Sequence, residues 1–292
     1  MVATVTLIFT VVSTPFWFFQ ASVLIFLFYC RYRGVGTYST TFFLLFTMLS
    51  IIDSISQITT FLGMRIHAFF DFVHPFYLSS PVYSSVLYLC SAYFLYTQCI
   101  LHLFIAINRI WNVYSILHSP SYKFVYLGNV IITLSPCFAV LLLIPRFFYV
   151  AMYFKNADGS LSLKYTDTMI QRYQSTVATS LIFVTAVPTF IIQLITVKKY
   201  QTFFEGHQVS MSKKHLQEYR LLCQAMVVIV VQLIFCAMQC TVYISTVTNN
   251  LALFTLIIGY YPYFGDFLNL TGPVALIVVS RKFRTDYTHK FT

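Results

Sequence analysis

Residues 221–265 decide the fold class, and they read LLCQAMVVIVVQLIFCAMQCTVYISTVTNNLALFTLIIGYYPYFG. These 45 consecutive positions carry no acidic or basic side chain. One helix needs about 20 apolar residues to cross the hydrocarbon core of a membrane, so the stretch is too long for a single crossing. The tripeptide Thr248-Asn249-Asn250 supplies polar turn residues within it. The stretch therefore predicts two membrane-spanning helices joined by a short turn.

The whole chain shares this apolar character. Hydrophobic residues make up 59% of its 292 residues and charged residues only 9%, and the mean hydropathy is +0.77. A soluble domain is about one quarter charged, and a disordered chain needs low hydrophobicity, so both classes are excluded. A soluble nucleic-acid binder is excluded as well, although the net charge is +10. We predict an all-α membrane protein that has lipid, and no nucleic acid, as a partner.

Working outward from this stretch, we count seven apolar spans. They are expected at about residues 6–30, 38–62, 81–107, 124–144, 175–197, 221–246 and 253–280. No separate soluble domain is expected within residues 1–292. In the tail, residues 281–292, aromatic side chains recur every four residues among Arg and Lys, which predicts a short amphipathic helix on the inner membrane surface.

The distribution of Lys and Arg predicts the orientation of the seven-helix bundle. The first cations, Arg31 and Arg33, follow the first span, so this span is expected to be a signal-anchor with the N-terminus outside. The inner segments then hold 13 cations and the outer segments 5. The outer cations are Arg65, Arg146, Lys155, Lys164 and Arg172. This imbalance agrees with the positive-inside rule and places the C-terminus in the cytoplasm.

Several short motifs occur in a characteristic order along the chain. They are STTFFLLF at 39–46, Ile51-Ile-Asp53 followed by Arg65, Ala106-Ile-Asn-Arg109, Pro120-Ser-Tyr122, Gly272-Pro273 and Ser280-Arg-Lys-Phe-Arg284. Their order and spacing resemble the nematode serpentine chemosensory receptors of the Srg superfamily, most closely class gamma and next class V. The resemblance covers nearly the whole chain.

The resemblance implies a G-protein-coupled receptor that senses a small external chemical at the plasma membrane, in such receptors often that of a sensory cilium. The ligand is expected in the outer half of the bundle, and a heterotrimeric G protein at the cytoplasmic face. No enzymatic activity, cofactor or metal is expected. The identity of the ligand does not follow from the resemblance.

Arg109, at the inner end of the third span, is the main candidate for G-protein coupling, together with Asn108 before it. Glu218, just before the sixth span, is a candidate acidic partner for Arg109 in the inactive bundle. Rhodopsin-like receptors have an acidic residue where this chain has Asn108. The alternative for Arg109 is a stop-transfer cation whose side chain extends to the lipid headgroups.

Helical steps from Arg109 place His102, Gln98 and Ser91 on one face of the third span. Polar groups are costly in lipid, so this face is expected to point into the bundle. Ser91 and Tyr88, near the outer mouth, are candidate ligand contacts. Gln98 and His102 are candidates for an intramembrane switch, and hydrogen bonding between helices is the alternative for both.

Asp53 and Asp266 are the acidic residues inside the predicted spans. Intramembrane carboxyl groups are costly and are often functional. We expect Asp266 either to bind a cationic ligand or to respond to protonation. Asp53 is a second switch candidate, and the two acids can alternatively hold a sodium ion or each other. A neutral, hydrogen-bonded carboxyl is the structural alternative for each.

Two further expectations concern backbone and cysteines. Gly272-Pro273 is expected to kink the seventh span, and Pro273 is therefore another switch candidate. Many receptors join the third helix to the following outer loop by a disulfide, but the expected helix position holds Ser84 and the segment 146–172 has no cysteine. We expect no such disulfide here.

The alternative function is a small membrane transporter or channel. Transporters often contain broken helices at matching positions of two repeats, whereas only the seventh span has a Gly-Pro break. The receptor is therefore the favoured prediction.

Overall fold

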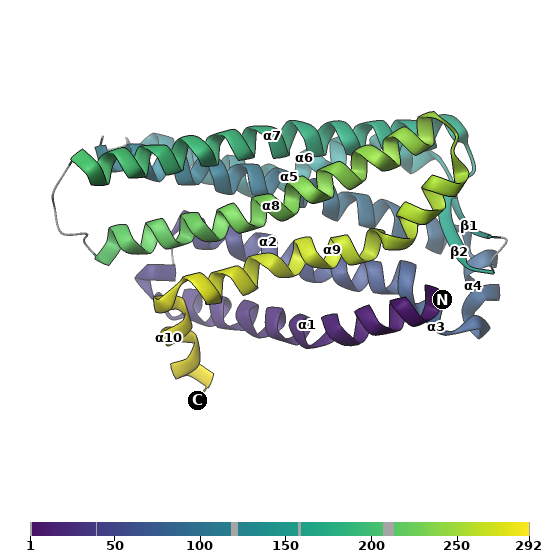
Figure 1. The fold of residues 1–292 in the computed structure, drawn as a ribbon, viewed down its shortest axis with the longest axis horizontal. Coiled ribbons are helices and arrows are strands. Elements are labelled where there is room, and N and C mark those ends of the chain that lie inside the picture. The colour runs from purple at the N-terminus through teal and green to yellow at the C-terminus, as the bar shows by residue number, and fades with distance from the viewer. Residues whose placement is uncertain (1, 39, 118–121, 157–158, 207–212, 292) are drawn as a thin grey trace.

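The computed structural model describes residues 2–38, 40–117, 122–156, 159–206 and 213–291. Seven of the described helices are long and apolar enough to cross a membrane, as predicted. Figure 1 shows them packed lengthwise in one bundle, with the N-terminus and the C-terminus at opposite ends. The long helices are α1 (Val2–Tyr32), α2 (Thr41–Thr60), α5 (Pro81–Leu117), α6 (Tyr122–Leu143), α7 (Thr168–Gly206), α8 (Lys213–Val247) and α9 (Leu251–Val279).

The shorter elements connect these helices at the two ends of the bundle. They are η1 (Gly36–Tyr38), the π-helical turn η2 (Phe61–Arg65), α3 (Ile66–Phe69), η3 (Asp71–Val73), α4 (His74–Ser79), η4 (Ile144–Phe148), β1 (Ala151–Lys155), β2 (Leu161–Tyr165) and α10 (Arg281–Phe291).

Several helices extend beyond the apolar spans that define them. α5 continues ten residues past the predicted end at residue 107, and α7 begins seven residues before residue 175. Hydropathy measures the part of a helix that lies in lipid, whereas backbone hydrogen bonding continues into the polar ends. As a result, Arg109 lies inside a continuous helix.

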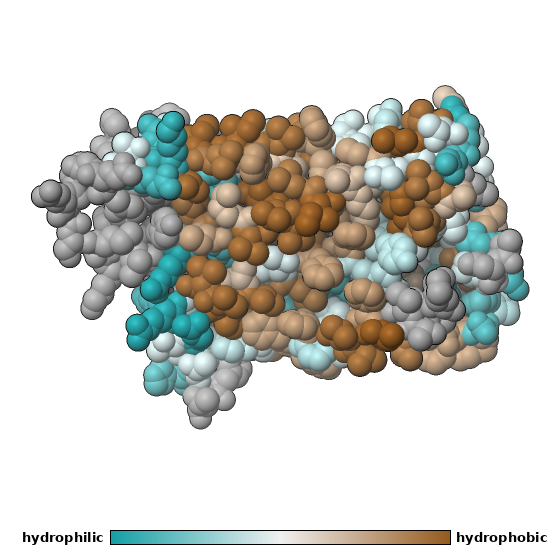
Figure 2. All heavy atoms as spheres, viewed as in Figure 1, coloured by the Kyte–Doolittle hydropathy of each residue, from teal (hydrophilic) through white to brown (hydrophobic). Residues whose placement is uncertain are grey.

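The outward face of the bundle is apolar. Large side chains such as Phe18, Leu141 and Val230 are 74%, 61% and 54% exposed. Figure 2 shows a wide hydrophobic band across the middle of one face, with hydrophilic residues toward both ends. Such a surface is stable in lipid, where every backbone polar group is paired within its own helix.

The predicted turn between the last two spans is confirmed. α8 ends at Val247 and α9 begins at Leu251. Asn249 adopts a positive φ of 52°, a conformation that Asn tolerates better than most residues. The side chain of Asn250 accepts a hydrogen bond of 3.1 Å from the backbone N–H of Leu253 and so caps α9.

α10 packs against the inner end of the bundle. Phe283 is 1% exposed and lies among Phe26, Tyr38 and Phe43. The Tyr38 hydroxyl donates a hydrogen bond of 2.7 Å to Asp286 of α10. The apolar face of the amphipathic helix α10 therefore covers an aromatic cluster between α1 and α2.

One element departs from the all-α prediction. The polar segment after α6 contains an antiparallel hairpin of β1 and β2, in which Ala151 pairs with Tyr165 and Lys155 with Leu161. Gly159 in its turn has a φ of +83°, which favours glycine. The alternation of buried and half-exposed residues along β2 accounts for the strand, because one face packs on the helices.

Candidate functional site: an outer cavity above a buried polar network

The outer end of the bundle, which carries the hairpin, encloses a cavity of about 1680 Å³. Residues of α5, α7, α8, α9, the hairpin and η2 form its wall. The predicted ligand contacts Tyr88 and Ser91 both lie in this wall. The volume exceeds that of most small-molecule pockets, so a small ligand fits within it.

The β-hairpin is attached to the first turn of α5 by the side chain of Ser85. The Ser85 hydroxyl accepts a hydrogen bond of 2.9 Å from the Ala151 N–H and donates one of 3.3 Å to the Ala151 carbonyl. All seven cysteines lie in the described residues, and none forms a disulfide. Hydrogen bonds therefore hold this hairpin at the place where many receptors use a covalent link.

The π-helical turn η2 provides a second attachment. The Tyr153 hydroxyl of β1 donates a hydrogen bond of 2.6 Å to the Gly63 carbonyl, and the Tyr77 hydroxyl of α4 donates to the Leu62 carbonyl. Burial raises the pKa of the Tyr153 phenol, so the hydroxyl stays protonated and remains a donor. The two tyrosines thus satisfy carbonyl groups of the irregular turn and hold the hairpin above it.

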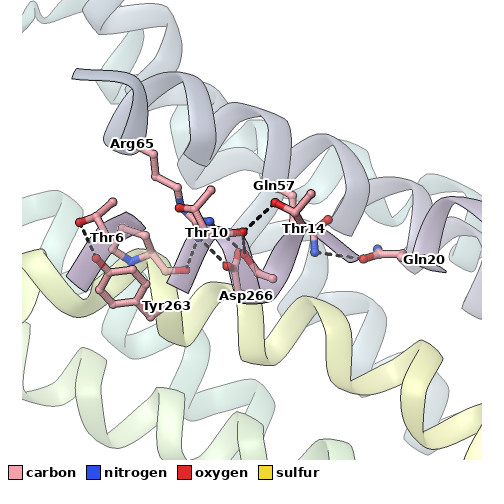
Figure 3. A network of polar contacts seen from close by, with 10 residues as sticks. Thr6, Thr10, Thr14, Gln20, Gln57, Arg65, Tyr263 and Asp266 are labelled. Carbon is pink, nitrogen blue, oxygen red and sulfur yellow. Dashed lines mark hydrogen bonds and ion pairs between the residues drawn. The ribbon is translucent and has the colours of Figure 1, made fainter. Parts of the chain in front are cut away.

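The same turn directs Arg65 into the bundle (Figure 3). Its Nη2 lies 2.6 Å from the Asp266 carboxylate of α9 and donates a hydrogen bond of 3.3 Å to the Pro262 carbonyl. Its Nη1 donates a longer bond of 3.4 Å to the Ser13 hydroxyl of α1. The guanidinium also faces the Trp17 ring at 5.3 Å. Arg65 therefore connects α1, η2 and α9 directly beside the cavity, whose wall includes it.

Two cations that we had assigned to outer loops are in fact buried. Arg65 is 1% exposed and Arg146 is 0% exposed. Each cation follows the apolar part of a span, which suggests a loop, whereas the π-helical turn η2 includes Arg65 and the 3-10 turn η4 includes Arg146. Arg109, one of the 13 inner cations, is buried as well. Without these three arginines the inner segments hold 12 cations and the outer segments 3, so the distribution favours the predicted orientation more strongly.

The polar face of α5 points into the bundle, as predicted. Gln98, His102 and Arg109 are 3%, 6% and 2% exposed. Gln98 donates a hydrogen bond of 2.6 Å to Asp53 of α2 and another to the Asn269 side chain of α9. Gln98 therefore joins three helices, which agrees with the structural alternative given for it.

Arg109 lies two turns of helix beyond His102, and its side chain is buried within the bundle. Its guanidinium stacks on the Phe42 ring at 3.6 Å from the ring centre. Phe42 is at the start of α2, so this contact joins the inner ends of α2 and α5. A buried cation on an aromatic face is stabilised by the ring quadrupole.

The two intramembrane acids have separate partners. Asp53 accepts from Gln98, whereas Asp266 is paired with Arg65. The alternative that the two acids bind each other is therefore excluded. The pair with Arg65 was not foreseen because Arg65 had been placed in a loop.

The remaining candidates lie at the inner end and in α9. Asn108 is half-buried beside Arg109. Glu218 lies in α8, but its side chain is outside the described part of the chain, so the proposed pair with Arg109 stays a prediction. Pro273 lies inside α9, and Gln224 donates a hydrogen bond of 3.4 Å to the adjacent Gly272 carbonyl. Pro262 lies in the first half of α9, where Figure 1 shows a bend.

Sequence reasoning missed several residues of this site. Trp17 and Tyr263 contact Arg65, and Tyr263 also shares a hydrogen bond of 2.6 Å with Thr6. An arginine close to the end of an apolar span, together with an acid in another span, was the available signal for the buried pair.

Comparison with known protein families agrees with this arrangement. The family described as "Serpentine type 7TM GPCR chemoreceptor Srv" matches residues 6–292. The chain belongs to the Srv family. The search of curated proteins found no match.

Membership supports the nematode serpentine resemblance at the level of chemoreceptors. The matched family is Srv, the class that the sequence analysis ranked second, and class gamma is not confirmed. This Srv chain is therefore a multi-pass membrane protein of a chemosensory receptor family. The match favours the receptor prediction over the transporter or channel alternative.

Proposed function

We propose that this Srv receptor binds a small external chemical in the outer cavity and activates a heterotrimeric G protein at its cytoplasmic end. The observation that carries the proposal is the cavity of about 1680 Å³, with Tyr88 and Ser91 in its wall. Ser91 and Arg109 lie on the same helix, about 27 Å apart at 1.5 Å per residue. The ligand site and the coupling site are thus at opposite ends of α5. We place the receptor in the plasma membrane, and its site of action in a sensory cilium.

The buried polar network provides a path between these ends. Arg65 lines the cavity and holds Asp266 of α9, so a ligand that contacts Arg65 competes with this pair. Below it, Gln98 joins α2, α5 and α9 through Asp53 and Asn269. We propose that ligand binding changes the relative positions of these helices, with His102 and the Pro273 region of α9 adapting.

At the cytoplasmic end, the change in helix positions releases Arg109 from the Phe42 ring. The freed guanidinium can then donate hydrogen bonds to carbonyl groups of the G protein. Asn108 and Glu218 lie on the helices that would border this interface.

Arg109→Ala should abolish G-protein activation without lowering surface expression. Cells expressing the receptor with an N-terminal tag and a G-protein dissociation sensor are exposed to a panel of small water-soluble and volatile chemicals. Arg31→Ala is the matched control, because Arg31 is an exposed cation at the inner end of α1. Activation by Arg109→Ala at the wild-type level would contradict the coupling role.

The cavity is tested in the same assay by Ser91→Trp, which fills part of it and should raise the ligand concentration needed for half-maximal activation. Ser180→Trp is the control, since Ser180 is exposed on α7 and lies outside the cavity wall. An equal response from both variants would mean that the ligand binds elsewhere.

A further inference from the structure

Arg146 occupies an unusual position at the outer end of the bundle. It lies in η4 directly after α6 and is 0% exposed. Its guanidinium faces the rings of Tyr88 and Tyr165, which pack against each other, and lies 5.2 Å from each ring centre. Its Nε donates a hydrogen bond of 2.8 Å to the Tyr165 hydroxyl, and its Nη2 donates one of 3.3 Å to the Tyr88 carbonyl.

The positive charge of Arg146 has no acidic partner in the described part of the chain. The ion pairs there are Arg65 with Asp266 and Asp71 with His74, and Arg146 takes part in neither. Its Nη1 has no hydrogen-bond acceptor among the described residues. A guanidinium keeps its charge when buried, and the two tyrosine rings and two hydrogen bonds offset only part of the cost of removing that charge from water. Arg146 therefore differs from Arg65, whose charge Asp266 neutralises.

Arg146 is separated from the outer cavity by a single layer of side chains. Tyr88, whose ring covers the guanidinium, lines the cavity. So does Gln171, whose amide oxygen accepts a hydrogen bond of 3.0 Å from the Tyr165 N–H and whose amide nitrogen lies 3.5 Å from the Tyr88 hydroxyl. The charge of Arg146 can therefore act on a ligand group that lies against these two side chains.

Two hydroxyl groups in the cavity wall have no hydrogen-bond acceptor among the described residues. Tyr96 of α5 and Ser175 of α7 are 0% and 3% exposed. The Tyr96 hydroxyl lies beside the Arg146 guanidinium, which is a donor only, so the hydroxyl hydrogen has no acceptor there. The Ser175 hydroxyl makes no hydrogen bond to a described residue. Both residues line the cavity. Buried polar groups are normally hydrogen-bonded, so these two hydroxyls can donate to an acceptor of a ligand. The amide oxygens of Gln174 and Gln239 in this wall also lack a partner among the described residues, and they can accept from a donor group elsewhere on the ligand. Donor hydroxyls in front of a buried cation are suited to an anion.

We propose that the outer cavity binds a small organic carboxylate, with its charged end among Tyr88, Tyr96 and Ser175 in front of Arg146. The apolar part of the ligand would lie against Leu95 and Ala178 in the same wall. This inference rests on the proposed function, because it assigns the chemical class of the ligand to the cavity described there. The carboxylate supplies the counter-charge that the described residues do not provide for Arg146.

The test measures thermal unfolding of the purified full-length receptor in lipid nanodiscs, without a G protein. The probes are hexanoate and benzoate, each compared with its neutral amide, hexanamide or benzamide. The carboxylates should raise the unfolding temperature in a concentration-dependent manner, and the amides should have little effect. An amide that stabilises the receptor as much as its carboxylate overturns the inference, and so does a lack of stabilisation by both carboxylates.

Variants then separate the charge of Arg146 from its structural contacts. Arg146→Gln should abolish stabilisation by carboxylates, whereas Arg146→Lys should retain part of it. Arg172→Gln is the matched control, because it removes an exposed outer cation and should leave the response unchanged.

Gln171→Glu keeps the test decisive if Arg146→Gln fails to fold. This near-isosteric change places an internal carboxylate next to the two tyrosines that hold Arg146. It should raise the unfolding temperature of the ligand-free receptor and weaken carboxylate binding at least tenfold. Unchanged carboxylate affinity in Gln171→Glu would overturn the inference.

A failure of the carboxylate inference can be distinguished from a failure of the proposed receptor function. A receptor that activates its G protein in response to neutral chemicals but ignores carboxylates contradicts this inference alone. A receptor that binds carboxylates through Arg146 but never activates a G protein supports the inference and contradicts the coupling proposal.

Discussion

At the residue scale, the Arg65–Asp266 contact shows how a charged pair is accommodated inside an apolar bundle. The Arg65 Nη2 lies 2.6 Å from the Asp266 Oδ2, and the two side chains are 1% and 9% exposed. The arginine has further acceptors in Pro262 and Ser13 and an aromatic face in Trp17. A buried pair depends on such additional contacts, because the desolvation of two charges offsets most of their attraction.

Asp266→Asn should lower the free energy of unfolding by about 3–5 kcal/mol, because it leaves the Arg65 charge buried without a counter-ion. The loss can be measured by thermal unfolding of the purified receptor in nanodiscs. Asp71→Asn is the control, since Asp71 pairs with His74 but its side chain is 99% exposed. Asp71→Asn should leave the unfolding temperature nearly unchanged.

The double variant Arg65→Met with Asp266→Leu distinguishes the loss of the pair from the creation of an unpaired charge. Apolar residues of similar size often replace a buried ion pair with little loss of stability, so the double variant should be more stable than Asp266→Asn. If Asp266→Asn alone is as stable as the wild type, the pair contributes nothing to the fold.

At the scale of elements, the β-hairpin replaces a covalent link with hydrogen bonds. Ser85 holds Ala151, and Tyr153 holds the Gly63 carbonyl of the π-helical turn. The hairpin therefore depends on the irregular turn below it, and the same turn directs Arg65 toward α9. The π-helical turn η2 therefore supports both the β-hairpin, which lines the cavity, and the buried Arg65–Asp266 pair.

Tyr153→Phe should destabilise the hairpin by about 1–3 kcal/mol, because the Gly63 carbonyl loses its buried donor. Limited proteolysis at the outer surface should cut the variant faster than the wild type. Tyr149→Phe is the matched control, because Tyr149 is 41% exposed and lies just before the hairpin. A reducing agent should change neither rate, and an effect of the reducing agent would indicate a disulfide instead.

At the scale of the whole molecule, the two ends of the bundle have different chemistry. The outer end contains the cavity, the tyrosine-rich hairpin and the buried Arg146. The inner end contains the Arg109–Phe42 contact and the aromatic cluster that α10 covers. α5 connects them and packs against α2, α6 and α7.

The orientation predicts where terminal tags are accessible. A tag at the N-terminus should be cleaved by protease added to intact cells, whereas a tag at the C-terminus should be cleaved only after permeabilisation. An odd number of crossings places the termini on opposite sides, and the excess of cations in the inner segments places the N-terminus outside. Both tags cleaved in intact cells would contradict the orientation and the receptor proposal together.

Local sequence patterns were sufficient for the fold class, the seven spans and the inward face of α5. Hydropathy acts over about 20 neighbouring residues, and the 3.6-residue period sets which side chains share a helix face. For this reason Tyr88, Ser91, Gln98, His102 and Arg109 could be placed before the structure was known. The turn at Asn249 was likewise a local feature.

Contacts between distant residues required the tertiary structure. Arg65 and Asp266 are separated by 201 positions, and Arg146 meets Tyr88 across 58 positions. Such contacts depend on the rotation, tilt and length of each helix, and a π-helical turn changes all three in a way that hydropathy does not record. The apolar pattern thus determined that the chain crosses the membrane seven times, whereas helix packing decided that two arginines close to span ends are buried and which side chains meet them.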